Sequence, residues 1–452
     1  MFTLNKPQNI FLLISLFFGF LILLTNPPFQ AADENLHFFR IYQLSEFKLL
    51  SDKNNDKIGT NLPTSLLTLT KKFEYLNHQS NLKTDLTTIK KCFNIALNKN
   101  EQTFIEFPSA SVYAPIGYTP QIVGIWVSKL INSPPILMMY ISRFFNLIAY
   151  SLSIFYAIKI TPVKKWLFFL LGLMPMSIYQ GSSLSIDGCT IGLSFLFIAF
   201  CLFLAYEESK SEITKRDMIL FTALISCIAL SKFTYILLIF LFFLVPKSKF
   251  KNNTSYYGYF SLALITSFIL LFIWTQLIKD IKIPTFFGYD NTESQAKYIF
   301  SNFSNYISIV FYTLLSRANS YVVSFFGLLG WMDTRLPVFL KDLYLNSLLV
   351  IAICSVETNT VVIKAKQKIL FSTITVIYVL LLLTIFFIYY TPGVAIIEGI
   401  QGRYFIPIIP LFYLLFHNNI KALQLPKLNI FAVIVPIFTL ILSMISLVVR
   451  YY

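Results

Sequence analysis

Long runs of apolar residues alternate with short polar loops along most of this chain of 452 residues. An α-helix needs about 20 apolar residues to cross the hydrocarbon core of a bilayer. On this criterion we predict about eleven spans, give or take one or two. The predicted spans are 8–25, 136–158, 165–181, 188–206, 217–231, 233–246, 257–279, 337–356, 369–390, 404–418 and 429–449. The pattern therefore predicts an all-α, polytopic transmembrane helical bundle that forms a single domain over 1–452.

The composition agrees with a membrane protein, because 56% of the residues are hydrophobic and only 13% are charged. The net charge of +15 does not indicate nucleic-acid binding, since the lysines gather in short loops between apolar segments. This distribution follows the positive-inside rule and predicts a cytoplasmic N-terminus, with the bilayer as the partner of the basic loops. These loops contain Lys159, Lys164, Lys165, Lys210, Lys215, Arg216, Lys247, Lys249, Lys251, Lys364, Lys366, Lys368, Lys421 and Lys427. Lys232 is the clear exception among the short loops.

The opposite face is predicted to hold a large first extracytoplasmic loop, residues 26–135. Within it, residues 51–103 form a polar insert in which 65–76 and 85–97 could be short amphipathic helices. Residues 113–131 are apolar enough to span, but a span there would move Lys164 and Lys165 to the outer face. We therefore interpret this segment as a juxtamembrane helix that lies in the interface or is partly re-entrant. The other segments predicted on this face are 181–187, 280–336 and 391–403.

A cluster of ionisable residues follows the first apolar segment, in the run Asp33-Glu34-Asn35-Leu36-His37-Phe38-Phe39-Arg40. Charges at a membrane surface cost free energy unless they have a role, so the cluster is a candidate functional site. If the run is helical, spacings of three and four place Asp33, His37 and Arg40 near one face, with Glu34 within reach of His37. A carboxylate beside an imidazole can serve as a general base. The alternative is a structural role, with Asp33 as the helix cap and Glu34 in the first turn.

Two further candidates lie in other predicted outer segments. Asp187 follows Ser182-Ser183-Leu184-Ser185-Ile186, where it could cap the next helix or join Asp33 around a phosphate or a metal. Arg403 stands just before a span in Gln401-Gly402-Arg403-Tyr404, and its guanidinium suits bidentate phosphate binding. The alternative for Arg403 is an interfacial anchor with an aromatic neighbour.

Other charged residues add to this set. Arg317 is a further candidate for phosphate binding, and Asp333 adds one carboxylate to an otherwise apolar loop. Arg143, inside a predicted span, should face the bundle interior or reach along the helix to the outer surface. The sequence contains no nucleotide-binding glycine-rich loop, no Ser-His-Asp order and no metal-ligand spacing. A group donor should therefore be lipid-linked and used from the outer face; no cofactor is required by the sequence, and a divalent metal ion stays open.

Several motifs, in their order along the chain, resemble a family of bacterial membrane proteins called domain of unknown function 2142. The motifs are Asp33-Glu34-x-x-His37-Phe38, Tyr118-x-Pro120, Arg143-x-x-Asn146, Leu173-x-Pro175-Met176, Ser183-x-Ser185-x-Asp187, Ser231-Lys232, Gly327-x-x-Gly330-Trp331-x-Asp333, and Gly402-Arg403-Tyr404-Phe405-x-Pro407-x-x-Pro410. Together they run through most of the chain apart from 51–103.

More distantly, the layout is similar to the GT-C superfamily of membrane glycosyltransferases. These enzymes have an acidic residue in the first outer loop, a Pro-containing juxtamembrane helix, an Asp in the second outer loop and often an Arg-Tyr-x-x-Pro-x-x-Pro run. They transfer a sugar from a polyprenyl-phosphate carrier, usually with inversion. The resemblance implies a GT-C-like fold, a glycosyl-transfer role for Asp33 or Glu34, and a second-loop role for Asp187.

This chain departs from several relatives in its juxtamembrane helix. They have a basic residue before the proline, whereas this chain has Gly117-Tyr118-Thr119-Pro120. Contact with a phosphate must then come from elsewhere, such as Arg40, Arg317 or Arg403. The residues expected to bind substrate are Arg40, Tyr118, Asp187, Arg317, Asp333, Arg403 and Tyr404.

The expected function is the transfer of a sugar from a polyprenyl-phosphate donor to a glycan, lipid or protein acceptor of the cell envelope. Asp33, or alternatively Glu34, would act as the general base, and His37 would orient that carboxylate or meet the donor phosphate. The alternative is a non-catalytic flippase, transporter or assembly factor for lipid-linked sugars. That alternative would use the same basic groups and would need no base.

Overall fold

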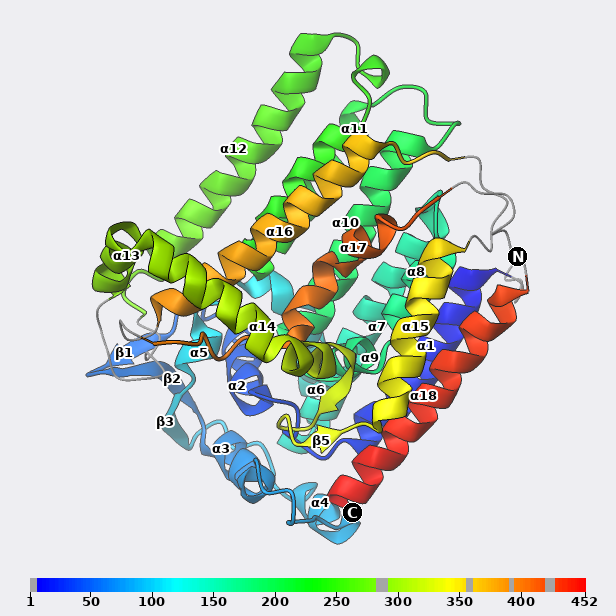
Figure 1. Cartoon of the computed structure of the whole chain (residues 1–452). Helices are drawn as coiled ribbons and strands as arrows, with labels where there is room; N and C mark the ends of the chain where they lie inside the picture. Colours follow the sequence, from blue (N-terminus) through cyan, green and yellow to red (C-terminus); the bar gives the residue numbers. More distant parts are fainter. Residues whose placement is uncertain (1–5, 282–291, 355–360, 390–393, 419–426) are drawn as a thin grey trace.

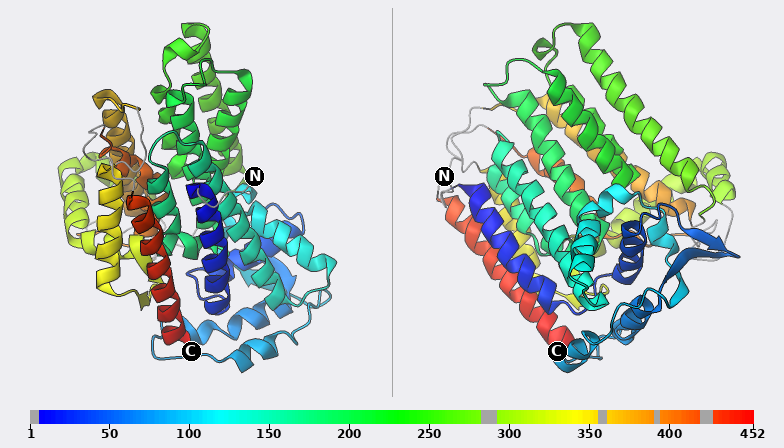
Figure 2. Two further views of the ribbon diagram at one scale, coloured as in Figure 1. Left: turned by 90° about the vertical axis from the view of Figure 1, so that its right-hand side faces the viewer. Right: turned by 180° about the vertical axis from the view of Figure 1, so that it is seen from behind.

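The computed structural model describes residues 6–281, 292–354, 361–389, 394–418 and 427–452. Long helices run side by side through the molecule, and the segments of the first loop gather at one end of them (Figure 1). The two further views show the same separation of bundle and loop (Figure 2). The chain is therefore a mostly helical bundle with a smaller mixed cap built from residues between the first two long helices.

Six helices of the described chain are long and apolar enough to cross a membrane. They are α1 (Pro7–Thr25), α7 (Pro135–Ile160), α10 (Ile186–Tyr206), α12 (Asn253–Leu277), α16 (Ala365–Ile388) and α18 (Leu428–Tyr451). Each matches a predicted span, so these six predictions and the assignment to an all-α membrane protein are confirmed. The total of about eleven is not confirmed.

The other five predicted spans form shorter or broken elements. The segment 165–181 divides at Met174 into α8 (Lys165–Leu173) and α9 (Pro175–Gly181), because proline cannot continue the hydrogen bonding of the preceding helix. The segment 404–418 likewise divides into η5 (Gly402–Ile408) and α17 (Ile409–Leu414). The remaining elements are α11 (Lys215–Ser231), the 3-10 helix η3 (Phe233–Leu244) and α15 (Val338–Ile353). Residues 355 and 356 of the span 337–356 lie outside the described residues.

Lysines from different basic loops meet the carboxyl ends of neighbouring helices. The Lys164 ammonium donates to the carbonyl oxygens of Ile351 and Cys354, at 3.2 and 2.9 Å, in the last turn of α15 and directly after it. The Lys249 ammonium donates to the Leu204 carbonyl oxygen at 2.9 Å, at the end of α10. Cations at helix carboxyl ends satisfy carbonyl groups that lack a helical partner and complement the helix dipole. These contacts place several of the basic loops at one common end of the bundle.

The polar insert of the first loop contains strands that the sequence analysis missed. A short antiparallel sheet has the order β1 (Asp52–Asn54), β2 (Lys57–Pro63) and β3 (Gln102–Glu106). Gly59 pairs with Glu106, and a side chain at Gly59 would meet the Ile105 carbonyl oxygen at 1.9 Å, so only glycine fits there. The helices expected at 65–76 and 85–97 are confirmed as α3 (Thr64–Lys71) and α4 (Leu86–Cys92), with the 3-10 turn η1 (Glu74–Leu76) after α3.

The predicted juxtamembrane helix is also present. The short helix α5 (Pro108–Ser111) and the 3-10 turn η2 (Pro115–Tyr118) lead into α6 (Thr119–Leu130), which packs against the first half of α7. Gly124 permits this close packing, because a Cβ there would lie 2.6 Å from the Ser142 Cα. None of α5, η2 and α6 is among the six candidate spans.

The sequence analysis assigned no secondary structure to the predicted outer segment 280–336. This part of the chain forms α13 (Thr292–Ser301), the long helix α14 (Phe303–Gly327) and a two-stranded hairpin of β4 (Leu328–Leu329) and β5 (Thr334–Arg335). Many of the residues of α14 are polar, so its hydropathy resembles that of a loop. Its helical structure is supported by packing against neighbouring elements such as η5 and α9, rather than indicated by its composition.

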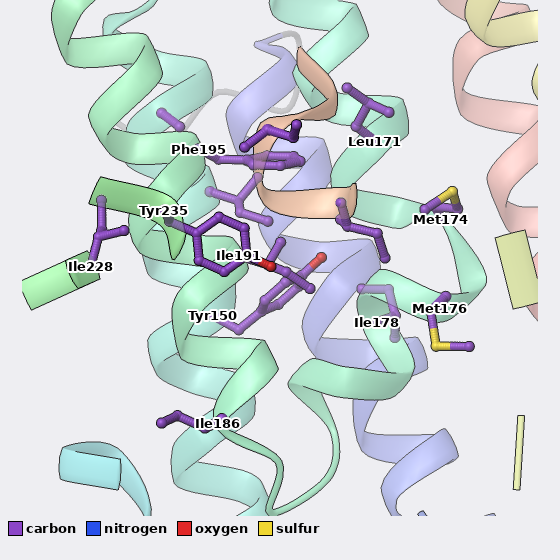
Figure 3. Close-up of a cluster of buried hydrophobic side chains, with 14 of the residues drawn as sticks. Tyr150, Leu171, Met174, Met176, Ile178, Ile186, Ile191, Phe195, Ile228 and Tyr235 are labelled. Atoms are coloured by element: carbon purple, nitrogen blue, oxygen red, sulfur yellow. The ribbon is translucent and has the colours of Figure 1, made fainter. Parts of the chain in front are cut away.

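The core of the bundle lies where α7, α8, α9, α10 and η3 meet. Figure 3 shows side chains from these elements, including Tyr150, Phe195 and Tyr235, packed into one apolar cluster. The Tyr150 hydroxyl donates to the Gly172 carbonyl oxygen at 2.5 Å, so even the polar tip of this buried ring is satisfied. The cluster ends near Ile186, one residue before Asp187, so the rigid core adjoins a segment that carries candidate chemistry.

Candidate functional site

The first charged run, for which the sequence analysis considered a helix, forms α2 (Glu34–Ser45). Asp33 occupies the position before it, with a positive φ of 62°. Its side chain makes no capping hydrogen bond, and among the described residues it makes no ion pair. Asp33 is partly exposed, whereas the side chain of Glu34 is fully buried. The two adjacent carboxylates therefore lie in different environments.

Glu34 is held in a dense set of hydrogen bonds with Arg143 of α7. The Arg143 Nε donates to Glu34 Oε1 at 2.8 Å, a second guanidinium nitrogen pairs with Oε2, and the Leu184 backbone N–H donates to Oε1 at 3.0 Å. Both side chains have 0% exposure. The rest of the guanidinium donates to three carbonyl oxygens in the last turn of α1 and just after it, those of Leu23, Asn26 and Pro27. Arg143 thus faces the interior and ties together α1, α2 and α7.

A second charged cluster lies where α10, α11 and η5 meet. The Lys232 ammonium, directly after α11, pairs with Asp187 Oδ1, and Arg403 Nε lies 3.5 Å from Asp187 Oδ2. Asp187 and Arg403 are 6% and 8% exposed, so the cluster is buried. The Arg403 Nε has no hydrogen-bond partner among the described residues. Two cations therefore share one carboxylate, and their donors are only partly used.

The expectation that Asp187 caps the next helix was wrong. Helix α10 begins at Ile186, and the Ser185 side chain caps it by accepting the Asp187 backbone N–H at 3.1 Å. Asp187 lies in the first turn, with its side chain free to pair with Lys232. A carboxylate at this position also complements the helix dipole.

Aromatic rings surround the Lys232 ammonium. It lies 4.8 Å from the centre of the Tyr404 ring and 5.9 Å from that of Tyr113, distances within the range of cation–π attraction. The hydroxyls of Tyr235 and Tyr378 both donate to the Tyr404 carbonyl oxygen, at 2.8 and 2.7 Å. These two stacked rings anchor η5, and so they fix the position of Arg403 next to Tyr404.

His37 links the first loop to this cluster. Its Nδ1 lies 2.6 Å from the hydroxyl oxygen of Tyr118, which follows from the proximity of α2 and η2. Burial lowers the pKa of His37 to about 4, against the opposing effect of the Asp33 and Asp187 carboxylates. Burial also keeps the pKa of the Tyr118 phenol well above its usual value. Near neutral pH both groups are therefore uncharged, and Nε2 of His37 has no hydrogen-bond partner among the described residues.

Asp33 belongs to the same neighbourhood through its charge. Its carboxylate acts electrostatically on His37, Tyr113, Tyr118 and Arg403. Six of the residues that the sequence predicted for the site thus come together here: Asp33, His37, Tyr118, Asp187, Arg403 and Tyr404. They come from the start of α2, from η2, from the start of α10 and from η5.

Other residues predicted for the site have different partners. Arg40 is fully buried and donates to Gln43 Oε1 and to the carbonyl oxygens of Leu49 and Tyr113, at 2.6, 3.1 and 3.2 Å. Arg317 of α14 forms an exposed ion pair with Glu398. In their present positions these two guanidinium groups stabilise the loop structure around them.

Asp333 lies in a third charged cluster. Its carboxylate pairs with Arg450 near the end of α18, at 2.7 Å, and Arg450 also donates to the carbonyl oxygens of Leu76, Gln79 and Leu82. This cluster joins the last helix to the first loop, and in the described residues no hydrogen bond or ion pair connects it to Asp187.

Sequence reasoning missed Lys232 and Tyr113 as members of the site. Lys232 carried a usable signal, because it was the lysine that broke the charge rule among the short loops. The described residues contain no group of three or more His, Cys, Asp or Glu side chains arranged to hold a metal ion. All five cysteines are free thiols.

The fold and the buried charges define a polytopic helical membrane protein with a polar cluster at the ends of its helices. Residues 16–412 match the family described as predicted membrane protein, DUF2142, and the chain belongs to that family. No curated protein and no solved structure matches the chain. The family membership that the motifs suggested is thus confirmed, while the likeness to GT-C enzymes stays a prediction.

Proposed function

We propose that this protein is a membrane glycosyltransferase that uses a polyprenyl-phosphate sugar as donor and an envelope glycan, lipid or protein as acceptor. In this proposal it resides in the bacterial inner membrane with its N-terminus in the cytoplasm and the Asp187–Lys232–Arg403 cluster toward the extracytoplasmic face. The observation that carries the proposal is that Lys232 and Arg403, which share Asp187 and keep unused donors, lie in the same neighbourhood as Asp33, a carboxylate with no hydrogen bond or ion pair in the described residues.

The proposed reaction is a single displacement. An acceptor hydroxyl oxygen attacks the anomeric carbon of the donor sugar and forms the new glycosidic bond. The bond between that carbon and the phosphate oxygen breaks, and its electron pair leaves with the polyprenyl phosphate. The acceptor proton passes to the Asp33 carboxylate, which acts as general base. Attack from the side opposite the leaving group inverts the anomeric configuration.

The leaving phosphate gains negative charge in the transition state, so cations near it lower the barrier. Arg403 and Lys232 are the cations available for this role, because each has donors that Asp187 does not use. Their position in a buried environment strengthens the interaction, since water does not screen it. In the proposal Tyr404 supports the ammonium, and Asp187 holds both cations in place before the donor binds.

His37 has the chemistry to assist at either end of this reaction. In this proposal the Tyr118 hydroxyl donates to Nδ1, so that the neutral ring carries its proton on Nε2 and donates it to a carboxylate or a phosphate. The burial that lowers the His37 pKa to about 4 keeps it in this form across the physiological range. We assign His37 the role of orienting Asp33 or of contacting the donor phosphate.

Glu34 is the alternative base of the sequence analysis. It differs from Asp33 because Arg143 and two backbone N–H groups already occupy its oxygens. Both oxygens of this buried carboxylate already accept hydrogen bonds, so an acceptor hydroxyl cannot approach it without displacing one of those donors. These contacts support Asp33 over Glu34.

The test uses the full-length protein in proteoliposomes, a panel of polyprenyl-phosphate sugars with a radiolabelled sugar, and envelope extract from a strain that lacks the protein. Wild type should move label into the acceptor fraction, and Asp33→Asn should reduce that transfer by about 10²-fold or more while leaving thermal unfolding unchanged. Asp56→Asn, in an exposed turn of the same loop, is the matched control and should transfer at the wild-type rate.

Three results would overturn parts of this proposal. Full transfer by Asp33→Asn would remove Asp33 as the base. Loss of transfer confined to Glu34→Gln, in protein that remains folded, would move the base by one residue. Movement of the labelled lipid across the bilayer without a new glycosidic bond would establish the flippase alternative instead.

A further inference from the structure

Helix α14 presents three distinct faces, although its mixture of polar and apolar residues resembles the composition of a loop. At about 100° per residue, its side chains divide into three strips roughly 120° apart. The buried strip contains Tyr306, Ile309, Val310, Thr313 and Ser324. The other two strips are exposed, and one is apolar whereas the other is mostly polar.

The exposed apolar strip follows a helical spacing of four residues. It contains Phe303, Ile307, Phe311, Leu315 and Val322, which are 61%, 43%, 64%, 64% and 38% exposed. The other exposed strip is mostly polar and contains Asn305, Ser308, Ser316, Asn319 and Ser320, together with the amphipathic Tyr312, which is 55% exposed. Large rings and branched chains at such exposure need an apolar partner, and polar side chains on the next face need water.

The ends of α14 lie at the ends of helices that enter the bundle. Near its start, the Tyr306 hydroxyl lies 2.6 Å from the Thr384 hydroxyl and its ring packs on Phe387, in the last turns of α16. After its last residue the chain turns through β4 and β5 into α15. Figure 1 shows α14 running across the long helices rather than along them, and it is not among the candidate spans. A helix in this position lies at the level where the spans end.

We propose that α14 is an interfacial helix. Its exposed apolar strip, from Phe303 to Val322, contacts lipid acyl chains at the boundary of the bilayer. Its exposed polar strip, from Asn305 to Ser320, faces water. An amphipathic helix lying in the membrane plane buries its apolar face at the boundary between headgroups and acyl chains. Val376 and Ile377 of α16, the helix that α14 contacts at Thr384, are also exposed apolar residues. Arg317, the only charged residue of α14, lies off the apolar strip and pairs with Glu398.

The packing of α14 also positions Arg403. The buried strip of α14 holds the segment before η5, since Thr313 Oγ1 accepts the Ile397 N–H at 3.0 Å and Ser324 Oγ accepts the Gly402 N–H at 2.8 Å. A Cβ at Gly402 would lie 1.9 Å from the Tyr321 carbonyl oxygen, so the backbones touch there. Arg403 directly follows this contact, and α14 therefore fixes the depth of the guanidinium relative to the bilayer boundary. The inference about α14 does not depend on sugar transfer.

A nitroxide scan of α14 in liposomes tests the proposal. Single cysteines at 305, 307, 308, 311, 315, 316, 319 and 322 would be labelled in a full-length variant whose five native cysteines are replaced by serine. Collision rates with oxygen, which concentrates in lipid, and with a water-soluble nickel chelate would be measured for each label. Phe268 on the exposed face of α12 and Asp56 in the first loop supply the lipid and water references.

We expect oxygen collisions to dominate at 307, 311, 315 and 322, and nickel collisions to dominate at 305, 308, 316 and 319. High nickel collisions on both strips would show α14 to be an aqueous element and would overturn the proposal. High oxygen collisions on both strips would show a fully lipid-embedded helix and would also overturn it. Low collision rates with both reagents on the apolar strip would identify a protein partner or a second copy in place of lipid.

A pair of charge insertions gives an independent check. Phe311→Lys should pull α14 toward water and lower the oxygen-to-nickel collision ratio of a label at 315 by at least twofold. Asn319→Lys, on the polar strip, should leave that ratio unchanged. Equal responses to the two substitutions would contradict the assignment of the strips.

Discussion

The Glu34 carboxylate receives hydrogen bonds from Arg143 and from two backbone N–H groups, whereas the Asp187 carboxylate is shared between Lys232 and a more distant Arg403. Arg143 also uses its remaining N–H groups on carbonyl oxygens at the end of α1. Arg403 leaves its Nε without a hydrogen bond among the described residues. Both clusters are buried.

This difference in hydrogen bonding indicates different roles for the Glu34–Arg143 cluster and the Asp187–Lys232–Arg403 cluster. Burying a charge is tolerable when its hydrogen-bonding capacity is filled, and the Glu34–Arg143 cluster meets that condition. The Asp187–Lys232–Arg403 cluster keeps two cations whose donors are not filled by protein, beside the uncharged His37 and the partly exposed Asp33. The first arrangement stabilises the junction of α1, α2 and α7. The second retains the capacity to bind an anion, which is the basis of the proposed function.

Among substitutions that distinguish the roles of the two clusters, Glu34→Gln is expected to lower the free energy of unfolding the most. Without the carboxylate, Arg143 is a buried and unpaired charge, and the loss of one partner of such a pair costs about 3–5 kcal/mol. The free energy of unfolding, measured by thermal or chemical denaturation in detergent micelles, should fall by that amount. Adding Arg143→Met should recover part of the loss, because it removes the unpaired charge.

Glu46→Gln is the matched control for this experiment. Glu46 follows the same helix and pairs with Lys129 at 2.8 Å, but its side chain is 40% exposed. Its loss should cost under about 1 kcal/mol. If Glu34→Gln cost no more than Glu46→Gln, the structural role of the Glu34–Arg143 cluster would be refuted.

The second prediction concerns pH and rests on His37. Its pKa is about 4 in the folded protein because burial disfavours the charged ring, and it is near 6.5 when unfolded. Between these values the unfolded chain binds a proton that the folded chain does not, so stability is present above pH 6.5 and is lost as the pH falls toward 4. The loss should reach about 3 kcal/mol.

The measurement is the midpoint of thermal unfolding at pH values from 7.5 to 4. His37→Gln should remove this component of the pH dependence, whereas His78→Gln, at an exposed position of the first loop, should keep it. An unchanged pH profile in His37→Gln would show that another group causes the loss.

An intermediate effect on stability is expected from Lys232→Met. Asp187 would still have Arg403 at 3.5 Å, so the cost should be about 1–3 kcal/mol, less than for Glu34→Gln. Binding of a polyprenyl-phosphate sugar, measured by scintillation proximity with purified protein, should weaken at least tenfold because a phosphate partner is lost. A larger stability loss than in Glu34→Gln, with unchanged donor binding, would make this cluster structural as well.

The smallest effect is expected from Arg317→Gln. This residue was a phosphate candidate, but its exposed pairing with Glu398 should contribute under about 1 kcal/mol, and less at high salt. Unfolding at low and high ionic strength would measure this contribution. Donor binding should stay at the wild-type level, and a tenfold loss would return Arg317 to the site.

Local pattern was enough to predict much of the fold. Long apolar runs located the six long apolar helices. Hydropathy did not locate α14, because this helix mixes apolar and polar residues along its length. It also failed for the strands at 52–54, 57–63 and 102–106, which pair with distant or exposed partners rather than repeat a strong alternation.

The sequence by itself determined the membrane class, the family, the positions of the long spans and the set of charged residues from which a site could be built. It did not determine which of the two adjacent carboxylates, Asp33 or Glu34, has its oxygens filled by hydrogen bonds from the protein. That choice depends on Arg143, 109 residues away from Glu34, and on the Leu184 N–H, 150 residues away. Nor did it predict that Lys232 pairs with Asp187. Only the tertiary structure decides these pairings, because desolvation makes each buried charge depend on whichever donors or acceptors the packed helices bring to it.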